Sequence, residues 1–311
     1  MRAATISEYG TPDQFRLEEL PDPLCGPDDV IVRVHAAGVN PVDTKIRQGR
    51  FAGRFVSHFP LVIGWDVSGV IEKVGPAIED WREGDEVFGY VRKHFLELGA
   101  YAERISVPYG LLAAKPPSLG HPEAGAVPLA GLTAYQALTD HLHLQPGETL
   151  LVHGAAGGVG SFAVQLGKSL GATVIGTASP DSFGYLEGLG VDGFLDYHAG
   201  PASEQLRNGG HPRGVDAVLD LRGGDTLADC PKALNETGRL VSVIDPSVKE
   251  LGGRYMFVHA DTEHLVELTR LIEAGELQVP LEAVFTLDQV ADAHRTVENG
   301  HVHGKVVLTM I

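Results

Sequence analysis

The sequence predicts an α/β protein with two domains, one rich in strands and one built on a parallel sheet. Residues 1 to about 115 contain short strand-like runs separated by Gly, Pro and Asp turns, a pattern typical of a small, partly open barrel. From residue 149 onwards, short apolar runs alternate with helical stretches, as in a doubly wound parallel sheet covered by helices. At 311 residues the chain is long enough for both domains.

Composition and charge narrow the class of protein. Hydrophobic residues make up 43% of the chain, but no apolar run approaches the ~20 residues of a membrane span. The first residues lack the long apolar segment of a secretory signal, so we expect a cytoplasmic protein with no membrane partner. The net charge of −17 repels nucleic-acid backbones, which excludes nucleic acid as an expected partner. Cys25 and Cys230 are too few and too far apart for a disulfide framework.

The first domain is predicted from its strands and from the boundary that follows them. The strand-like runs are residues 2–7, 29–36, 63–75, 84–90 and 99–107. The Pro-rich stretch 115–123 marks the change of pattern, because proline interrupts regular structure. We therefore place the domain boundary near residue 118.

The second domain begins with a helical pattern that runs from Glu123 to Leu138. The strands predicted for its sheet are residues 149–153, 173–178, 193–196, 215–220 and 238–244. A helix at 262–274 and strands at 282–286 and 305–309 end the chain, and we expect this segment to return to the first domain. The predicted domains are residues 1–118 with 261–311, and residues 119–260.

A glycine-rich turn follows the first strand of the second domain. Its spacing is Ala155-x-Gly157-x-x-Gly160, so alanine replaces the first glycine of the dinucleotide fingerprint. Apolar residues spaced by three and four then indicate a helix. Strand, small-residue turn and helix together predict a site where a pyrophosphate meets the helix N-terminus. The alternative is a glycine-rich turn without a ligand.

Six motifs occur in an order that resembles the medium-chain dehydrogenase/reductase superfamily, in its zinc-independent NADPH:quinone oxidoreductase-like branch. They are Gly38–Asp43, Gly64–Gly69, Gly84–Val87, Gly131–Tyr135, Ala155–Gly160 and Gly304–Leu308. The resemblance implies a GroES-like β-barrel catalytic domain, a Rossmann domain that binds NADP(H), and an active site in the cleft between them. It also implies an oxidoreductase, and we expect a homodimer.

Two positions of the sequence indicate whether the chain carries the zinc ligands of related enzymes. Zinc alcohol dehydrogenases carry cysteine where this chain has Asn40 and histidine where it has Trp65, and neither Asn nor Trp is a plausible zinc ligand. We therefore expect no metal. Without a Lewis acid, the hydride acceptor must already be electron-poor, as a quinone or an α,β-unsaturated carbonyl is.

The resemblance also implies site residues. Asn40, Asp43 and Thr133 would lie at the nicotinamide end of the cofactor. The alternatives are a turn at Asn40, a helix N-cap at Asp43 and an ordinary helix position at Thr133. The residues implied around the cofactor are Phe51, Ala156, Gly157, Gly158, Val159, Gly160, Thr177, Ser179, Tyr197, Ile244, Ser247, Phe257 and His259. Those from 156 to 160 would hold the pyrophosphate, those from 244 to 247 the nicotinamide ribose, and those from 257 to 259 the carboxamide.

Phe51 departs from the family pattern, because relatives often carry a proton-donating tyrosine there. A dedicated enoyl-thioester reductase is therefore disfavoured, and His58, Tyr90 or water would supply the proton. The strand end at Thr177 to Ser179 is neutral, which admits the 2′-phosphate of NADPH, although Asp181 opposes it.

Two other functions stay open. One is reduction of a specific unsaturated acid or biosynthetic intermediate. The other is a low-turnover, NADPH-binding structural or regulatory protein. The substrate is not specified by the motifs, because the walls of the acceptor pocket are expected from loops 49–60 and 91–98.

Overall fold

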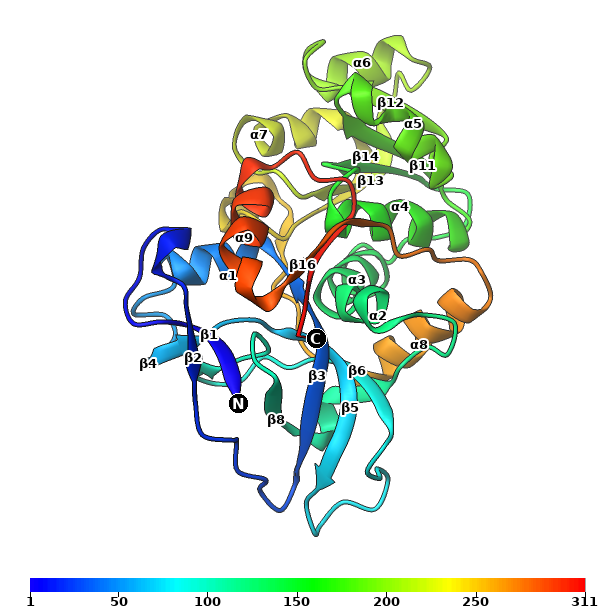
Figure 1. The fold of residues 1–311 in the computed structure, drawn as a ribbon. Helices are drawn as coiled ribbons and strands as arrows, with labels where there is room; N and C mark the ends of the chain where they lie inside the picture. Colours follow the sequence, from blue (N-terminus) through cyan, green and yellow to red (C-terminus); the bar gives the residue numbers. More distant parts are fainter. Residues whose placement is uncertain (311) are drawn as a thin grey trace. The chain divides into compact units, whose positions relative to one another are not determined.

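The computed structural model describes residues 1–310 and divides the chain into two compact units. The first, here called the barrel unit, contains Met1–Leu129, Ala260–Glu273 and the chain from Val279 onwards. The second, the sheet unit, contains Ala130–His259 and Ala274–Gln278. The barrel unit is thus assembled from both ends of the chain, which Figure 1 shows as blue and red segments side by side.

The barrel unit is organised around the long strand β3 (Asp29–Val39), which pairs with three other strands. The larger sheet has the order β16-β17-β3-β5-β6-β9, and β8 also pairs with β3. The bounds are β5 (Asp66–Val74), β6 (Glu86–Tyr90), β8 (Arg104–Pro108), β9 (Leu112–Ala114), β16 (Leu281–Thr286) and β17 (Lys305–Thr309). The smaller sheet has the order β2-β1-β4-β7, formed by Arg16–Glu19, Arg2–Ile6, Ser57–Val62 and Leu96–Leu98.

Strand β17 completes the larger sheet by running antiparallel to β3, with Leu308 opposite Ala37. Both strands are almost fully buried, so the hydrophobic effect stabilises this long-range pairing. The helices of the unit are α1 (Pro41–Arg47), α2 (His121–Ala126), α8 (Thr262–Glu273) and α9 (Val290–Asn299).

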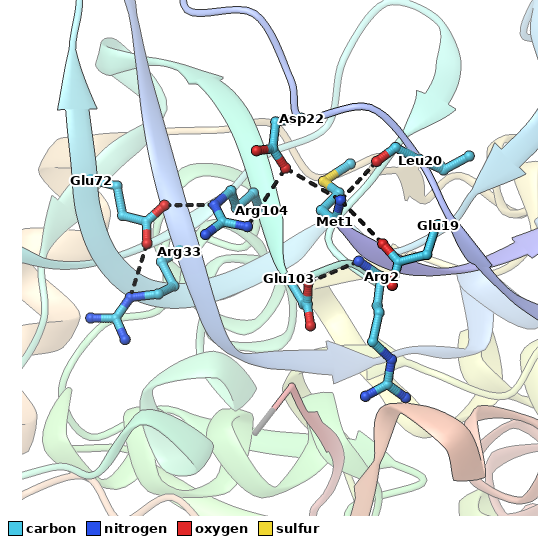
Figure 2. Close-up of polar contacts among 9 residues, drawn as sticks. All are labelled: Met1, Arg2, Glu19, Leu20, Asp22, Arg33, Glu72, Glu103 and Arg104. Carbon is cyan, nitrogen blue, oxygen red and sulfur yellow. Dashed lines mark hydrogen bonds and ion pairs between the residues drawn. The ribbon is translucent and has the colours of Figure 1, made fainter.

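Polar contacts surround the start of strand β1 in the barrel unit (Figure 2). The amino group of Met1 donates to the carbonyl oxygen of Leu20 at 2.7 Å and lies 3.3 Å from an Asp22 carboxylate oxygen. Arg104 on β8 donates to Glu72 on β5 at 2.7 Å. Exposed ion pairs contribute only about 0–1 kcal/mol each, so these contacts define strand positions more than they stabilise the fold.

The sheet unit contains a fully parallel sheet with the order β12-β11-β10-β13-β14-β15. The bounds are β10 (Thr149–His153), β11 (Thr173–Ala178), β12 (Gly193–Asp196), β13 (Val215–Asp220), β14 (Leu234–Ser242) and β15 (Arg254–Tyr255). Numbered within the unit, this is the 3-2-1-4-5-6 order of a Rossmann fold. The helices that follow the strands are α4 (Gly158–Ser169), α5 (Phe183–Gly188), α6 (Ala202–Asn208) and α7 (Gly224–Ala233).

The core of the sheet unit explains the apolar runs seen in the sequence. Leu151, Ile175 and Val218 come from three adjacent strands and belong to one buried cluster. All of β10 except its first residue is buried, because helices cover both faces of the sheet. The prediction of a GroES-like domain and a Rossmann-type domain is confirmed.

Several predicted elements differ from the structure, among them the strand predicted at 99–107, which begins only at Arg104. The helix predicted from Glu123 to Leu138 is two helices, because Pro128 cannot donate a backbone hydrogen bond and starts the second one, α3 (Pro128–Gln136). Strand β14 begins at Leu234 rather than at residue 238. Within residues 1–310, no helix has both the length and the apolar composition needed to cross a membrane.

Candidate cofactor and active sites

The glycine turn connects β10 to α4 in the sheet unit. The backbone of Gly154 has φ +70°, a left-handed conformation that favours glycine. Gly157 takes the N-cap position of α4 with an extended conformation, φ −74° and ψ 177°. The turn closes through a hydrogen bond from the Gly157 amide to the Gly154 carbonyl oxygen at 3.2 Å.

Each glycine of the turn region has a different physical role. A Cβ atom on Gly160 would lie 2.3 Å from the carbonyl oxygen of Gly154, so any side chain there forces the turn apart. A Cβ on Gly176 would lie 2.7 Å from the Cβ of Ala155, so this glycine of β11 makes room for the alanine. A Cβ on Gly157 would meet only one atom, at 3.5 Å. Gly157 therefore borders open space that the fold leaves available to a ligand.

The start of α4 suits an anion. Within residues 1–310, the amides of Gly158, Val159 and Gly160 have no backbone acceptor, as expected for the first turn of a helix. These amides and the positive end of the helix dipole attract negative charge. The structure thus brings the predicted pyrophosphate residues 156–160 together around an open turn, and a diphosphate fits their chemistry.

The neighbouring strand ends hold the residues predicted at the adenosine end of the cofactor. Thr177, at the end of β11, is buried, and its hydroxyl oxygen accepts a hydrogen bond from the Gly154 amide at 3.1 Å. The hydroxyl of Ser179 lies 3.1 Å from that of Ser182. Tyr197 follows β12 and is 47% exposed. These positions lie at the carboxyl edge of the sheet, where such folds bind ligands.

Asp220 and Ser242 at this edge were not predicted from the sequence. The Ser242 hydroxyl donates to an Asp220 carboxylate oxygen at 2.7 Å and accepts hydrogen bonds from the amides of Ile244 and Asp245. Asp245 in turn accepts from the amide of Ser247 at 2.9 Å. The loop that carries the predicted residues Ile244 and Ser247 is therefore shaped by buried polar groups. The available signal was a polar residue at the end of each apolar strand.

Gln136 holds the segment predicted near the carboxamide. Its side-chain amide donates to the His259 carbonyl oxygen at 2.9 Å and its side-chain oxygen accepts from the His259 amide at 3.2 Å. Phe257 in this segment is 40% exposed. Thr133 lies three residues before Gln136 on α3, on the same side of the helix, and is buried. Gln136 was missed because nothing in its local sequence distinguishes it.

Asn40 and Asp43 lie together at the start of α1 in the barrel unit. Asn40 is the N-cap residue, and its amide donates to an Asp43 carboxylate oxygen at 2.8 Å. Asp43 is thus the third residue of the helix rather than its N-cap. The Asn40 side-chain amide donates to Asp66 at 2.8 Å, and its side-chain oxygen accepts from the ammonium group of Lys305. The sequence placed Asp66 and Lys305 in motifs but assigned them no role.

These side chains form a buried polar cluster, here defined as Asn40, Asp43, Asp66, Tyr101 and Lys305. Burial raises the pKa of Asp43 to about 7, although hydrogen bonds from the Asn40 amide and the Tyr101 hydroxyl oppose the shift. Burial raises the pKa of Asp66 to about 6, opposed mainly by Lys305. Burial lowers the pKa of Lys305, which lies 3.8 Å from Asp66. The cluster fixes the orientation of the Asn40 side chain and the position of the α1 N-terminus.

A line of aromatic rings extends from Phe51. The ring of Phe51 packs against Phe55 at 5.6 Å between centroids, Phe55 against Trp65 at 6.3 Å, and Trp65 against Tyr90 at 6.1 Å. The Tyr90 hydroxyl is buried and has no hydrogen-bond partner within residues 1–310. Burial raises the pKa of Tyr90, so its hydroxyl keeps its proton. His58 instead stacks on Phe95 outside this line.

A small pocket lies beside Trp65 in the barrel unit. The segment from Val91 to Gly99 supplies seven of its lining residues, which are Val91, Lys93, Phe95, Leu96, Glu97, Leu98 and Gly99. Of the two loops expected to wall the acceptor pocket, the one at 91–98 lines this pocket, whereas loop 49–60 supplies none of its lining residues.

The residues that the structure describes contain no group of three His, Cys, Asp or Glu side chains placed to hold a metal ion. Asn40 and Trp65 occupy the positions of the family's zinc ligands, and both are buried against other side chains. The absence of a metal requirement stays a prediction.

Comparison with known proteins agrees with this architecture. Residues 26–117 match the alcohol dehydrogenase GroES-like domain, and residues 189–308 match the family described as zinc-binding dehydrogenase. The chain is 36% identical to a 2-methylene-furan-3-one reductase of Solanum lycopersicum and to a chloroplastic NADPH-dependent alkenal/one oxidoreductase of Arabidopsis thaliana. Each match covers 99% of this chain and 79% of the relative.

A solved structure extends the likeness over the whole fold. The quinone oxidoreductase of Coxiella burnetii superposes with a TM-score of 0.91 at 30% identity, over 100% of this chain and 99% of the other. The chain is therefore an oxidoreductase, as these relatives are. The chain belongs to the medium-chain dehydrogenase/reductase superfamily, in the branch of quinone and enone oxidoreductases.

Proposed function

We propose that this protein transfers hydride from NADPH to a quinone or an α,β-unsaturated carbonyl without a metal ion. The observation that carries the proposal is the open glycine turn at the start of α4, where Gly157 leaves room for a ligand and three amides lack a backbone acceptor in the described part of the chain. The named activities of the relatives support the same cofactor and acceptor classes. In this proposal residues 119–260 bind the cofactor and residues 1–118 with 261–311 form the catalytic domain.

NADPH, when bound, supplies the hydride. Residues 156–160 would bind its pyrophosphate through backbone amides, and the loops at 244–247 and 257–259 would border its nicotinamide half. Thr133 would approach the nicotinamide from α3. The hydrogen bonds that the Ser242 hydroxyl accepts from the first loop, and those that Gln136 makes with the second, keep these loops in one conformation, which lowers the entropy lost on binding.

The barrel unit supplies the residues proposed around the acceptor. Asn40, held by Asp66 and Lys305, and Asp43 would shape the polar part of the pocket, and Phe51 with its aromatic neighbours would form the apolar part. Aromatic faces stack well on a planar quinone or enone. Phe51 has no proton to give, and burial makes the Tyr90 hydroxyl a weaker acid by raising its pKa, so the proton that completes the reduction would come from water.

The first prediction concerns turnover. Purified protein with NADPH and a simple quinone should oxidise NADPH steadily, at the same rate with and without a metal chelator. The preparation should also contain less than one zinc per chain. A panel of enones measured beside the quinones identifies the better acceptor class. Failure of every acceptor despite NADPH binding would favour a low-turnover binding protein, and one essential zinc per chain would overturn the metal-free mechanism.

The second prediction concerns cofactor choice. Two or three exposed contacts from amides or helix ends give ~0.3–1 kcal/mol each, and Asp181 repels the ~1.5–2 negative charges of a 2′-phosphate. A net ~1–2 kcal/mol corresponds to a kcat/KM preference for NADPH over NADH of roughly five- to thirtyfold. Asp181→Arg should increase this preference, and added salt should reduce the gain, because Asp181 is exposed.

The matched control for this prediction is Glu204→Arg, which makes the same charge change at an exposed position of α6. It should leave the ratio of kcat/KM values unchanged. A native preference for NADH would show that the end of β11 was interpreted wrongly.

We further propose that the protein is a cytoplasmic homodimer. The free thiols of Cys25 and Cys230 support a reducing compartment such as the cytoplasm. Sedimentation of the purified protein measures the oligomeric state directly.

A further inference from the structure

Near the end of β11, Thr177 is hydrogen-bonded to the glycine turn through both its backbone and its side chain. Strands β10 and β11 run parallel with His153 opposite Thr177, so Thr177 stands directly beside the start of the turn. Its backbone carbonyl oxygen accepts from the Ala155 amide at 3.1 Å, and its hydroxyl oxygen accepts from the Gly154 amide, also at 3.1 Å. Two successive amides of the turn are thus held by one residue of the neighbouring strand.

His153 faces the same hydroxyl from the end of β10. Its Nδ1 atom lies 3.3 Å from the Thr177 hydroxyl oxygen, and the side chain is 2% exposed. Burial lowers the pKa of His153 to about 4, so the ring is neutral at pH 7. The Thr177 hydroxyl thus lies between the Gly154 amide, from which it accepts, and the neutral imidazole of His153, with which it can form a second hydrogen bond. Hydrogen bonds therefore run from the Gly154 amide to Thr177 and on to His153.

We propose that Thr177 and His153 are positioning residues that hold the glycine turn in the shape needed to receive the pyrophosphate of the cofactor. The inference rests on the proposed function and deepens it. It assigns Thr177 a different task from contact with the 2′-phosphate, because its hydroxyl is buried and already engaged on both sides. Discrimination between NADPH and NADH is then left to the exposed positions that follow β11 and β12.

A positioning role for Thr177 predicts a specific pattern in the dissociation constants of NADPH and NADH. NADPH and NADH share the pyrophosphate and differ only at the 2′ position, so a change in the turn should weaken both to the same extent. A residue that touched the 2′-phosphate would affect NADPH alone. The ratio of the two dissociation constants therefore separates positioning of the turn from direct contact with the phosphate.

The experiment compares Thr177→Val, which keeps the side-chain shape but removes the hydroxyl, with Thr177→Ser, which keeps the hydroxyl. Loss of a buried hydrogen bond should raise the Kd of Thr177→Val by about tenfold for both cofactors, measured by fluorescence titration. Thr177→Ser should stay within about threefold of the native protein. Without any cofactor, hydrogen exchange of the turn peptide that contains Gly154 should accelerate in Thr177→Val and not in Thr177→Ser.

His153→Phe tests the second residue. It should weaken both cofactors by a few fold in the native background and have no added effect on Thr177→Val, because His153 acts through the Thr177 hydroxyl. His153→Asn, which returns a polar group near the position of Nδ1 that can accept or donate, should restore binding. Three results would overturn the inference. They are weaker binding of NADPH with unchanged binding of NADH, unchanged affinity of Thr177→Val for both cofactors, and additive effects of the Thr177 and His153 substitutions. A native protein that binds neither cofactor would instead overturn the proposed function.

Discussion

Replacing Lys305 by methionine is expected to lower the free energy of unfolding of the barrel unit by about 3–5 kcal/mol near pH 8. Lys305 is the cation of the buried cluster, with Asp66 at 3.8 Å and Asn40 hydrogen-bonded to its ammonium group. Its removal leaves Asp66 and Asp43 buried without a positive partner. Loss of a buried ion-pair partner is costly because the remaining charge is desolvated and unpaired.

The cost of Lys305→Met should depend on pH with a defined sign. Burial already holds the pKa of Asp66 at about 6, above its value of ~3.9 in an unfolded chain, and removal of the lysine raises it further. A carboxyl with a raised folded-state pKa destabilises the fold as pH rises through that pKa and has no such effect below the unfolded value. The substitution should therefore cost little near pH 4–5 and most above pH 7.

Both tryptophans of the chain, Trp65 and Trp81, lie in the barrel unit, so urea unfolding followed by tryptophan fluorescence reports on that unit. The control is Asp66→Asn/Lys305→Met, which removes both charges and keeps an acceptor for the amide of Leu129. We expect the double variant to recover at least half of the lost stability at pH 8. A single substitution that costs less than about 1 kcal/mol at pH 8, or the same at pH 5 and pH 8, would contradict this account.

Only part of the buried polar cluster was predictable from the sequence. Asn40 and Asp43 were found because they share one short motif, and the local spacing of a helix start brings them together. The partners Asp66 and Lys305 come from β5 and β17, and only the pairing of both strands with β3 places them beside Asn40. No local pattern carries that information, because it depends on the order of strands in the sheet.

The sheet unit was more predictable because its signals are local. Short apolar strands, a turn of small residues and a helical repeat follow one another within about 20 residues, and each leaves a pattern in the sequence. The first residues of β14 were missed because they are partly exposed and polar, without the apolar run that marks its buried end. The separation of α2 from α3 was predictable from Pro128 alone.

The roles of side chains at strand ends were also not predictable from the sequence. Thr177 was predicted as a neutral position beside the 2′-phosphate, and the structure shows its hydroxyl on the Gly154 amide. The residue type shows that position 177 is uncharged. The hydrogen-bond partners of Thr177 instead depend on the register between β10 and β11. The loops near 49–60 and 91–98 pose the same problem, since the shape of a pocket depends on packing between distant segments.

Gly157→Val is expected to abolish measurable NADPH binding, at least about a hundredfold or ~2.7 kcal/mol in affinity, while the protein stays folded. The backbone of Gly157 is extended, a conformation that valine adopts readily, and a Cβ there meets only the Gly154 carbonyl oxygen at 3.5 Å. The cost to stability should therefore stay near the ~1 kcal/mol of a poorer N-cap. The branched side chain would instead fill the open space through which a pyrophosphate reaches the amides of α4.

Two further substitutions make the Gly157→Val result specific to the proposed phosphate site. Gly160→Ala should unfold the sheet unit or disorder its turn, because the added Cβ lies 2.3 Å from one carbonyl oxygen and 2.5 Å from another. Gly188→Val places the same side chain in open space at the last residue of α5, and should leave NADPH affinity unchanged. NADPH titration measures affinity, and circular dichroism verifies the fold of each variant. If Gly157→Val binds NADPH as tightly as the native protein, the turn is not the phosphate site, because no bulky group can share that space with a pyrophosphate.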